Sequence, residues 1–222
     1  MSAHAVEHPG QLFHGLYPAT VTGLQGDPDG RQRIEVEFPW LPDVGSGPPR
    51  AWATIVTPYA DDDQGFQMLP EVDSTVVVGF QAGYLDHPYV VGAVWNGKAA
   101  APESFSNSND KRLIRSRAGS RLEFDDTAGA VKVTVETPSG HHLVLDDGQG
   151  SVEVRCASGS TITMNMAGGI RIEAASTIEV SAAMVTVDAP MSRFTGIVEC
   201  TTLIADAGVV SPSYTPGAGN VW

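Results

Sequence analysis

Basic residues are scarce in this 222-residue chain, where 13 Lys and Arg stand against 26 Asp and Glu, giving a net charge of −13. Because phosphate contacts need clustered Lys and Arg, we expect no nucleic-acid partner. Two cysteines cannot build a disulfide framework, and we expect both to be small core residues. No apolar run approaches the roughly 20 residues that span a bilayer. The first ten residues lack the basic and apolar segments of a Sec signal, so we expect synthesis in the cytoplasm.

The chain divides into two parts of different composition. The first part, up to about residue 97, holds three of the four Trp and ten of the fifteen Pro, whereas the second part is rich in Val, Thr, Ser, Ala and Gly. A small, polar segment between them is typical of a linker. We therefore predict an extension, a first domain, a linker, a second domain and a tail, at residues 1–15, 16–98, 99–110, 111–210 and 211–222.

The first domain is predicted to be a small barrel. In segment 31–38, Ile34, Val36 and Phe38 alternate with glutamates, which indicates a strand with one buried and one wet face. Similar short strands are predicted at 17–24, 51–59, 75–81 and 89–95. Five short strands in about 80 residues favour a closed barrel of the OB type.

The second domain contains a repeat. Gly119, Gly140 and Gly159 each begin a similar segment, as in GSRLEFDD and GHHLVLDD, at spacings of 21 and 19 residues. Between and after these segments we predict strands at 131–136, 151–156, 169–174, 176–182 and 184–189. About ten strands with a period near ten residues indicate a solenoid-like β-structure.

An apolar stripe runs through these strands, because hydrophobic residues alternate with charged or hydroxyl side chains. No predicted helix or large aromatic residue could cover the stripe, so we predict that three copies surround a threefold axis and bury it in a prism. The predicted trimer core is Val131, Val133, Val135, Val152, Val154, Ile170, Ile172, Ile178, Val180, Val185 and Val187. The alternative is a conventional β-sandwich that buries the stripe within one chain.

Several segments resemble spike proteins of contractile injection systems. DPDGRQRIEVEFPW (27–40), LPEVDSTVVVGF (69–80) and HPYVVGAVWNGK (87–98) are similar to successive blocks of their OB domain. KRLIRSRAGSRLEFDD (111–126) is similar to the entry of their triple-stranded β-helix, and the tail 211–222 is similar to tails in this group. The resemblance points to phage baseplate assembly protein V and to spikes of extracellular contractile injection systems. Valine-glycine repeat (VgrG) proteins of type VI secretion, which carry a hub module ahead of the OB domain, are more distant.

The resemblance implies an all-β fold, with an OB-fold barrel followed by an intertwined trimeric triple-stranded β-helix or prism. It implies a structural protein and not an enzyme: a membrane-piercing central spike that caps the inner tube and hub of a phage-tail-like particle or virion baseplate. The implied partners are two further copies, a baseplate hub protein at the OB end and a PAAR-type tip protein at the C-terminal end, with the target membrane met only on puncture. In the tail, Tyr214, Val221 and Trp222 are candidates for tip docking, and the alternative is a frayed terminus.

Candidate chemistry is sparse, and we predict no catalytic residue, metal site or cofactor. His141 and His142 are adjacent in a predicted strand and should point to opposite faces, so they cannot chelate one ion together. The pairs Asp125-Asp126 and Asp146-Asp147 recur at equivalent repeat positions, which favours a role in turns over glycoside hydrolysis. The basic cluster 111–121 is expected to neutralise acidic neighbours. The alternative function is a β-helical tailspike that binds or cleaves carbohydrate.

Overall fold

The computed structural model describes residues 12–211, and the fold is all-β apart from one 3-10 turn in that range. The chain forms two compact units. The first unit ends at Glu173 and contains both the barrel and the sheet described below, and the second unit begins at Ala174. No helix within the described range is long and apolar enough to cross a membrane.

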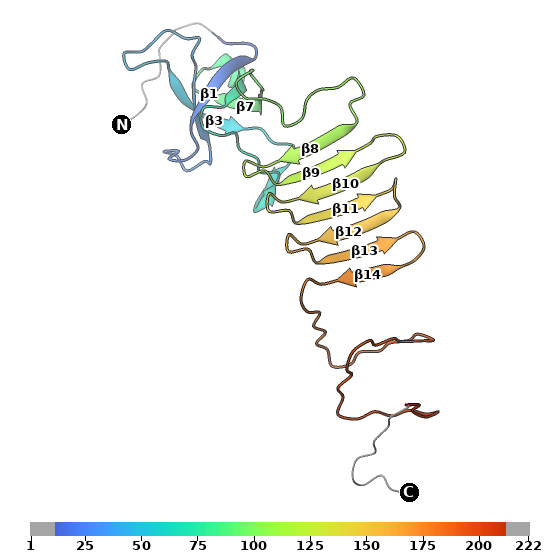
Figure 1. Ribbon diagram of the computed structural model, residues 1–222. Coiled ribbons are helices and arrows are strands. Elements are labelled where there is room, and N and C mark those ends of the chain that lie inside the picture. Colours follow the sequence, from blue (N-terminus) through green and yellow to red (C-terminus); the bar gives the residue numbers. More distant parts are fainter. Residues whose placement is uncertain (1–11, 212–222) are drawn as a thin grey trace. The chain divides into compact units, whose positions relative to one another are not determined.

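The first domain is a closed five-stranded barrel, as predicted (Figure 1). Its strands follow the order β1-β2-β3-β7-β6, in which only β3 and β7 pair in parallel. All five lie where alternation indicated them. Their bounds are β1 Tyr17–Gly23, β2 Ile34–Glu37, β3 Arg50–Ile55, β6 Thr75–Phe80 and β7 Pro88–Ala93. A short hairpin of β4 (Ala60–Asp61) and β5 (Gln64–Gly65) was not predicted, and a 3-10 turn, Gln81–Gly83, follows β6.

Inward side chains of the barrel strands form its core, because every second residue of a strand faces the interior. All of them are at most 3% exposed: Ala19, Val21, Ile34, Val36, Phe38, Ala53, Val76, Val78 and Val90. Phe13, Tyr17, Trp40 and Phe80 form an aromatic cluster, in which Tyr17 and Trp40 stack at 4.7 Å between ring centroids. The barrel therefore has a complete core within one chain.

One loop of the barrel is organised by a single carboxylate. The Asp27 side chain accepts backbone hydrogen bonds from Asp29, Arg31 and Arg33 at 2.8–3.2 Å. It also accepts from Nε and Nη2 of Arg33. Gly30, with φ +65°, completes the turn. The DPDG sequence between β1 and β2 thus fixes a turn through Asp27.

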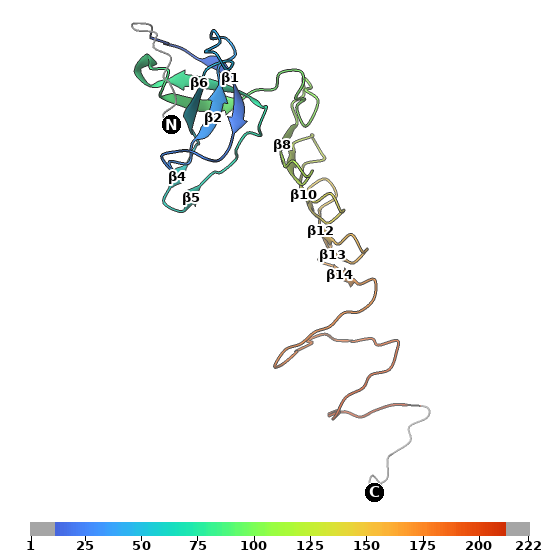
Figure 2. The ribbon, with the colours of Figure 1, turned by 90° about the vertical axis from the view of Figure 1, so that its left-hand side faces the viewer.

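The second domain begins with a seven-stranded antiparallel sheet in which consecutive strands are neighbours (Figure 1). Seen nearly edge-on, the sheet is a single layer (Figure 2). Its seven strands pair with one another in sequence order within the chain. The strands are β8 Lys111–Arg115, β9 Arg121–Asp125, β10 Lys132–Glu136, β11 His142–Asp146, β12 Ser151–Arg155, β13 Thr161–Asn165 and β14 Ile170–Glu173.

The repeat in the sequence is a repeat of turns. Gly119, Gly140 and Gly159 occupy equivalent positions, and the N–H of each donates to the carbonyl three residues earlier at 2.9–3.0 Å. Their φ angles are +90° to +95°, a backbone conformation that L side chains rarely adopt. The spacing of these glycines therefore reflects one turn at every second strand.

The predicted strands at 176–182 and 184–189 are wrong for the single chain, because no strand is formed in residues 174–211. About ten strands were expected in the second domain, and its described part has seven. A strand requires a hydrogen-bonded neighbour as well as an alternating pattern. Among residues 12–211, the alternating segment after Glu173 has no such neighbour.

Candidate functional site: the apolar face of the sheet

One face of the β8–β14 sheet is almost entirely apolar. Residues directly opposite each other in antiparallel strands point to the same face, so the register defines two columns of side chains across the sheet. One column consists of Ile114, Leu122, Val135, Leu143, Val154, Ile162 and Ile172. The other consists of Arg112, Phe124, Val133, Leu145, Val152, Met164 and Ile170. Arg112, at the first strand, is the one charged residue in either column.

No part of the described chain, residues 12–211, covers this apolar face. Val135, Leu145 and Val154 are 42–43% exposed, and Ile170 is 68% exposed, whereas the core residues of the barrel are at most 3% exposed. Burying the remaining area would stabilise the protein by roughly 1 kcal/mol for each such side chain. A face of this kind is a surface for association.

The opposite face is polar and makes its own ion pairs. Glu123 and Asp125 are 3% and 7% exposed. Glu123 lies 3.8 Å from Lys111 Nζ and 3.4 Å from Arg121 Nη1. Further along the sheet, His142 Nε2 lies 3.0 Å from Glu153 Oε1. The apolar face, which a globular protein would bury, is thus the more exposed one in this chain, and the charged side chains lie on the opposite face.

The apolar face is narrow, since each strand contributes two positions to it. Two alternate residues along a strand are about 7 Å apart, and seven strands extend about 30 Å from the first to the last. A long, narrow strip offers little width for packing one flat sheet on another. Three such strips around an axis can instead meet at their centre, so that both columns of each copy become core.

Six of the eleven predicted core residues lie on this face: Val133, Val135, Val152, Val154, Ile170 and Ile172. Val131 directly precedes β10, and it is 38% exposed. The other four, Ile178, Val180, Val185 and Val187, lie in the segment without strands and are 57–71% exposed. The role of all eleven in a trimer core stays a prediction.

Sequence reasoning missed half of the face. Leu122, Phe124, Leu143, Leu145, Ile162 and Met164 occupy the alternating positions of the glycine-led segments, and the structure places them in β9, β11 and β13. When the glycine of each segment is counted as residue 1, residues 4 and 6 are apolar. This alternation is the signal from which the strands could have been predicted. It identifies three further strands once the segments are treated as strands and not only as repeats.

The carboxylate pairs act in turns, as predicted. Asp125 Oδ1 accepts hydrogen bonds from the backbone N–H and the hydroxyl of Thr127, which lower the pKa of the Asp125 carboxyl. Asp146 Oδ1 accepts from the N–H of Gln149 at 2.8 Å in the equivalent position of the next repeat.

The two histidines diverge as predicted. His142 pairs with Glu153 on the polar face, while Nδ1 of His141 accepts a hydrogen bond from the N–H of Ala157. Among residues 12–211 no three His, Cys, Asp or Glu side chains come close enough to hold a metal ion.

The cysteines do not both behave as core residues. Cys200 is exposed in the single chain, which contradicts the expectation, and Cys156 is partly buried. Hydrogen bonds from the side chain and backbone of Ser158 lower the pKa of the Cys156 thiol. Cys200 lies in residues 174–211, which form no strand and contain no buried residue.

The basic cluster contacts acidic side chains, as predicted. Lys111 and Arg121 pair with Glu123, Arg112 pairs with Asp126, and Arg117 lies 3.1 Å from Glu71. Four of the five basic side chains of the cluster therefore form ion pairs with acidic side chains of the same chain.

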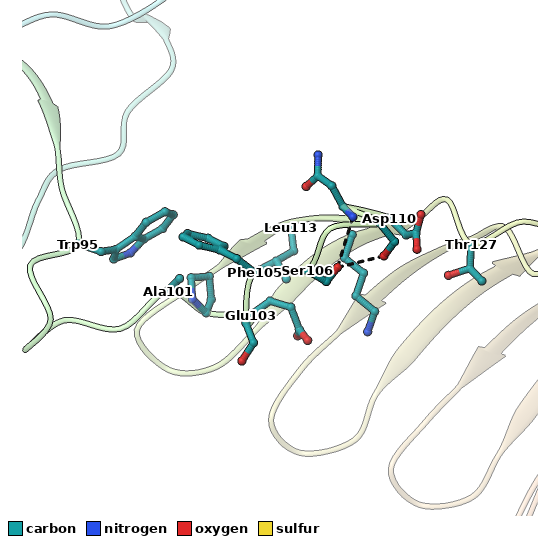
Figure 3. Close-up of a pocket in the computed structure, with 13 residues that line it drawn as sticks. Trp95, Ala101, Glu103, Phe105, Ser106, Asp110, Leu113 and Thr127 are labelled. Carbon is teal, nitrogen blue, oxygen red and sulfur yellow. Dashed lines mark hydrogen bonds between the residues drawn. The ribbon is translucent and has the colours of Figure 1, made fainter.

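A pocket of about 310 Å³ lies between the linker 99–110 and the beginning of β8 (Figure 3). Phe105 packs edge-on against Trp95 at 5.9 Å between ring centroids, and Leu113 and Thr127 line the pocket from the sheet. Its polar lining is dominated by linker residues such as Ser106, whose Oγ lies 3.0 Å from that of Ser108. Glu103, Asp110 and Lys111 supply the charged groups of the lining.

Comparison with known proteins agrees with both domains. Residues 17–95, which contain the barrel, match the family described as the type VI secretion system/phage-baseplate injector OB domain. Residues 132–191 match the phage baseplate V C-terminal trimerisation domain. The chain is also 23% identical over 154 residues to the actin cross-linking toxin VgrG1 of Vibrio cholerae serotype O1. That match covers 65% of this chain and 14% of the length of the toxin.

An injector OB barrel followed by a trimerisation domain defines a structural spike component of a phage-tail-like particle. More narrowly, the chain belongs to the phage baseplate V family, whose two domain matches together span more than half of its length. The trimerisation domain supports a homotrimer, and it begins at the first residue of β10, within the apolar sheet.

Proposed function

We propose that this chain is the membrane-piercing central spike of a contractile tail or an extracellular contractile injection system. Three copies would close their sheets into a prism, with the barrels toward the tube and hub. The observation that carries the proposal is the uncovered apolar face, in a domain that belongs to a trimerisation family.

Stiffness is the property that puncture requires. Three seven-stranded walls would hold a dense set of backbone hydrogen bonds around a core of β-branched and other aliphatic side chains. A rod built in this way would resist bending and could transmit an axial force.

The charge of the spike suits passage across an envelope. From Leu122 onward the chain has 12 acidic and 4 basic residues, which makes each copy of the spike segment strongly negative. Such a surface disfavours adhesion to anionic lipid and favours solubility before firing. Contact with the target membrane would therefore be brief and mechanical.

Two further partners complete the proposal. A baseplate hub protein would bind at the barrel end, and a PAAR-type tip protein would bind at the C-terminal end. The candidate tip-docking residues Tyr214, Val221 and Trp222 lie outside the described residues.

The alternative, a carbohydrate-binding or carbohydrate-cleaving tailspike, has less support. Sugar-binding rods present exposed aromatic rings along a groove, and the polar face of β8–β14 carries no Phe, Tyr or Trp. A glycan array and a hydrolysis screen with the purified trimer should therefore give no specific binding and no cleavage.

Light scattering on the purified protein tests the central claim. The expected particle mass is three times the 23.4 kDa of one chain, and it should persist at micromolar concentration. A stable monomer with the circular dichroism of a β-protein would overturn the proposal, because the folded chain would then be stable with its apolar face exposed to water.

A further inference from the structure

Polar side chains border the apolar face of the β8–β14 sheet, and strand β11 shows this border at both of its ends. Alternate residues of a strand share a face, so His141 and Asp147 continue the line of the two leucines of β11 in either direction. Strand pairing extends as far as both residues. The Thr137 N–H donates to the His141 carbonyl at 3.0 Å, and the Asp147 N–H donates to the carbonyl of Val131 at 2.9 Å. The two polar residues therefore lie at opposite edges of the sheet, on one strand and on the apolar side.

Each of these two side chains keeps a polar group without a partner. Nδ1 of His141 accepts a hydrogen bond from the Ala157 N–H at 3.2 Å, so the proton of the neutral ring is on Nε2, which is left as a donor. Both side chains are exposed, and among residues 12–211 neither Nε2 of His141 nor the Asp147 carboxylate has a hydrogen-bond or ion-pair partner. A donor and an acceptor are thus available at the two ends of one strand.

A threefold axis brings opposite edges of the sheet together. Neighbouring copies in a ring meet head to tail, so one edge of each copy faces the other edge of the next copy. The turns of the sheet alternate between these two edges (Figure 1). Turns 116–120, 137–141 and 156–160 lie at the edge of His141, and turns 126–131, 147–150 and 166–169 lie at the edge of Asp147.

This alternation restricts how two edges can meet. The turns of one edge repeat at every second strand, about 10 Å apart, and each gap between them is level with a turn of the opposite edge. Two walls can therefore interdigitate in steps of two strands, whereas a shift by one strand would set turn against turn. When the strands of neighbouring copies are level, turn 147–150 of one copy enters the gap between turns 137–141 and 156–160 of the next.

Hydrophobic burial discriminates only weakly between these registers. Both columns of the apolar face carry an aliphatic or aromatic side chain on nearly every strand, so a shift by two strands still sets apolar residues against apolar residues over the remaining overlap. A polar pair that fits at only one level can specify the register instead.

His141 meets a free carboxylate in only one of these registers. With the strands level, it faces Asp147 of the next copy. A shift by two strands in one direction would set it against turn 166–169, whose sequence MAGG has no acidic residue. A shift in the other direction would set it against Asp126, which already pairs with Arg112 of its own chain.

We propose that Nε2 of His141 donates a hydrogen bond to the Asp147 carboxylate of the next copy at each of the three corners of the prism. These three pairs fix the axial register in which the walls associate. The inference rests on the proposed trimer, and it names the side-chain contact that aligns the copies.

Site-directed cross-linking tests the contact. In the full chain, Cys156→Ser and Cys200→Ser remove the native thiols, and light scattering shows whether this background is trimeric. His141→Cys combined with Asp147→Cys and treated with a short bismaleimide should then give covalent trimers in a denaturing gel. The two positions are about 20 Å apart along β11 within one chain, so a short linker can join them only between copies.

A shifted pair is the matched control. His141→Cys combined with Asp126→Cys places the second thiol two strands away on the same edge, and this variant should remain largely uncross-linked. Each single-cysteine variant should remain uncross-linked as well. Cross-linking of the shifted pair in preference to the level pair would contradict the proposed register.

A charge exchange in the chain with its native cysteines tests the polar contact itself. His141→Asp sets two carboxylates against each other at every corner and should lower the melting temperature of the trimer. Adding Asp147→Lys should restore at least half of that loss, because opposite charges then face each other. Ser120→Asp lies at the same edge two strands away, and Asp147→Lys should not restore the loss that this control causes.

The outcomes separate the two proposals. A parent protein that is never trimeric overturns the proposed function. A trimeric background in which the His141 and Asp147 cysteine pair does not cross-link, or a trimer in which Asp147→Lys does not restore the loss caused by His141→Asp, overturns the register inference and leaves the trimeric spike intact.

Discussion

Arg33 clamps Asp27 through two hydrogen bonds, from Nε at 3.1 Å and from Nη2 at 2.6 Å. The guanidinium, with further backbone N–H donors, holds the pKa of the Asp27 carboxyl well below its ordinary value of 3.8. A carboxyl whose pKa is lower in the folded state stabilises the fold at pH values above its unfolded pKa. That stabilisation is lost as the pH falls through the folded pKa.

We therefore expect Asp27→Asn to lower the melting temperature of the barrel at pH 7 and to flatten its pH dependence below pH 3.8. Circular dichroism melts between pH 2 and pH 7 would measure both effects. Asp61→Asn, at an exposed hairpin position, is the matched control and should melt like the parent protein. Equal melting curves for Asp27→Asn and the parent would show that the clamp does not stabilise the barrel.

Charge placed on the apolar face should dissociate the trimer. Leu145 and Val144 are adjacent in β11 and point to opposite faces, and Val144 lies opposite Glu153. Leu145→Lys would place three ammonium groups in the prism interior, at a cost of several kcal/mol per trimer. Val144→Lys would instead place the charge on the outer face beside a glutamate.

Sedimentation velocity at micromolar concentration would distinguish these two variants. We expect Leu145→Lys to yield monomer or aggregate, and Val144→Lys to remain trimeric. If both variants stay trimeric, the apolar face is not the interface.

The barrel strands could be predicted from the sequence because alternation is a local property. Ile34, Val36 and Phe38 alternate with glutamates, and all three are buried. The β4–β5 hairpin has two residues in each strand, which is too short to show any period. Its existence depends on backbone pairing between Ala60 and Gly65, which no side-chain pattern records.

The apolar face could be predicted in kind but not in extent. Val133 and Val135 were predicted as core residues because they lie in a clear alternating run. Leu143 and Leu145 were assigned only to a repeat that begins with glycine, and their own alternation was overlooked. The predicted strands after Glu173 failed for a different reason. Alternation determines which face a side chain takes, but it does not determine whether a hydrogen-bonding neighbour belongs to the same chain.

The turn glycines should be required for the β8–β14 sheet. Gly140 has φ +90°, and a Cβ at this position would meet nothing within 4 Å, so substitution tests backbone strain without a clash. Gly140→Ala should destabilise each wall by roughly 1–3 kcal/mol and lower the melting temperature of the trimer. Gly92→Ala is the control, because Gly92 also has open space and has no positive φ. A Gly140→Ala protein that melts like the control would contradict the assigned role of these turns.

The C-terminal tail should recruit the tip protein. Removing residues 211–222 eliminates all three candidate docking residues, Tyr214, Val221 and Trp222, and leaves the matched trimerisation domain, residues 132–191, intact. We expect the shortened chain to remain trimeric by light scattering and to lose at least most of its binding to a PAAR-type tip protein in a pull-down. Trp222→Ala alone should weaken the binding, because a terminal indole would supply a large part of the apolar contact area, and Ser213→Ala serves as the control within the same tail. Undiminished tip binding by the shortened trimer would show that the platform for the tip lies elsewhere on the spike.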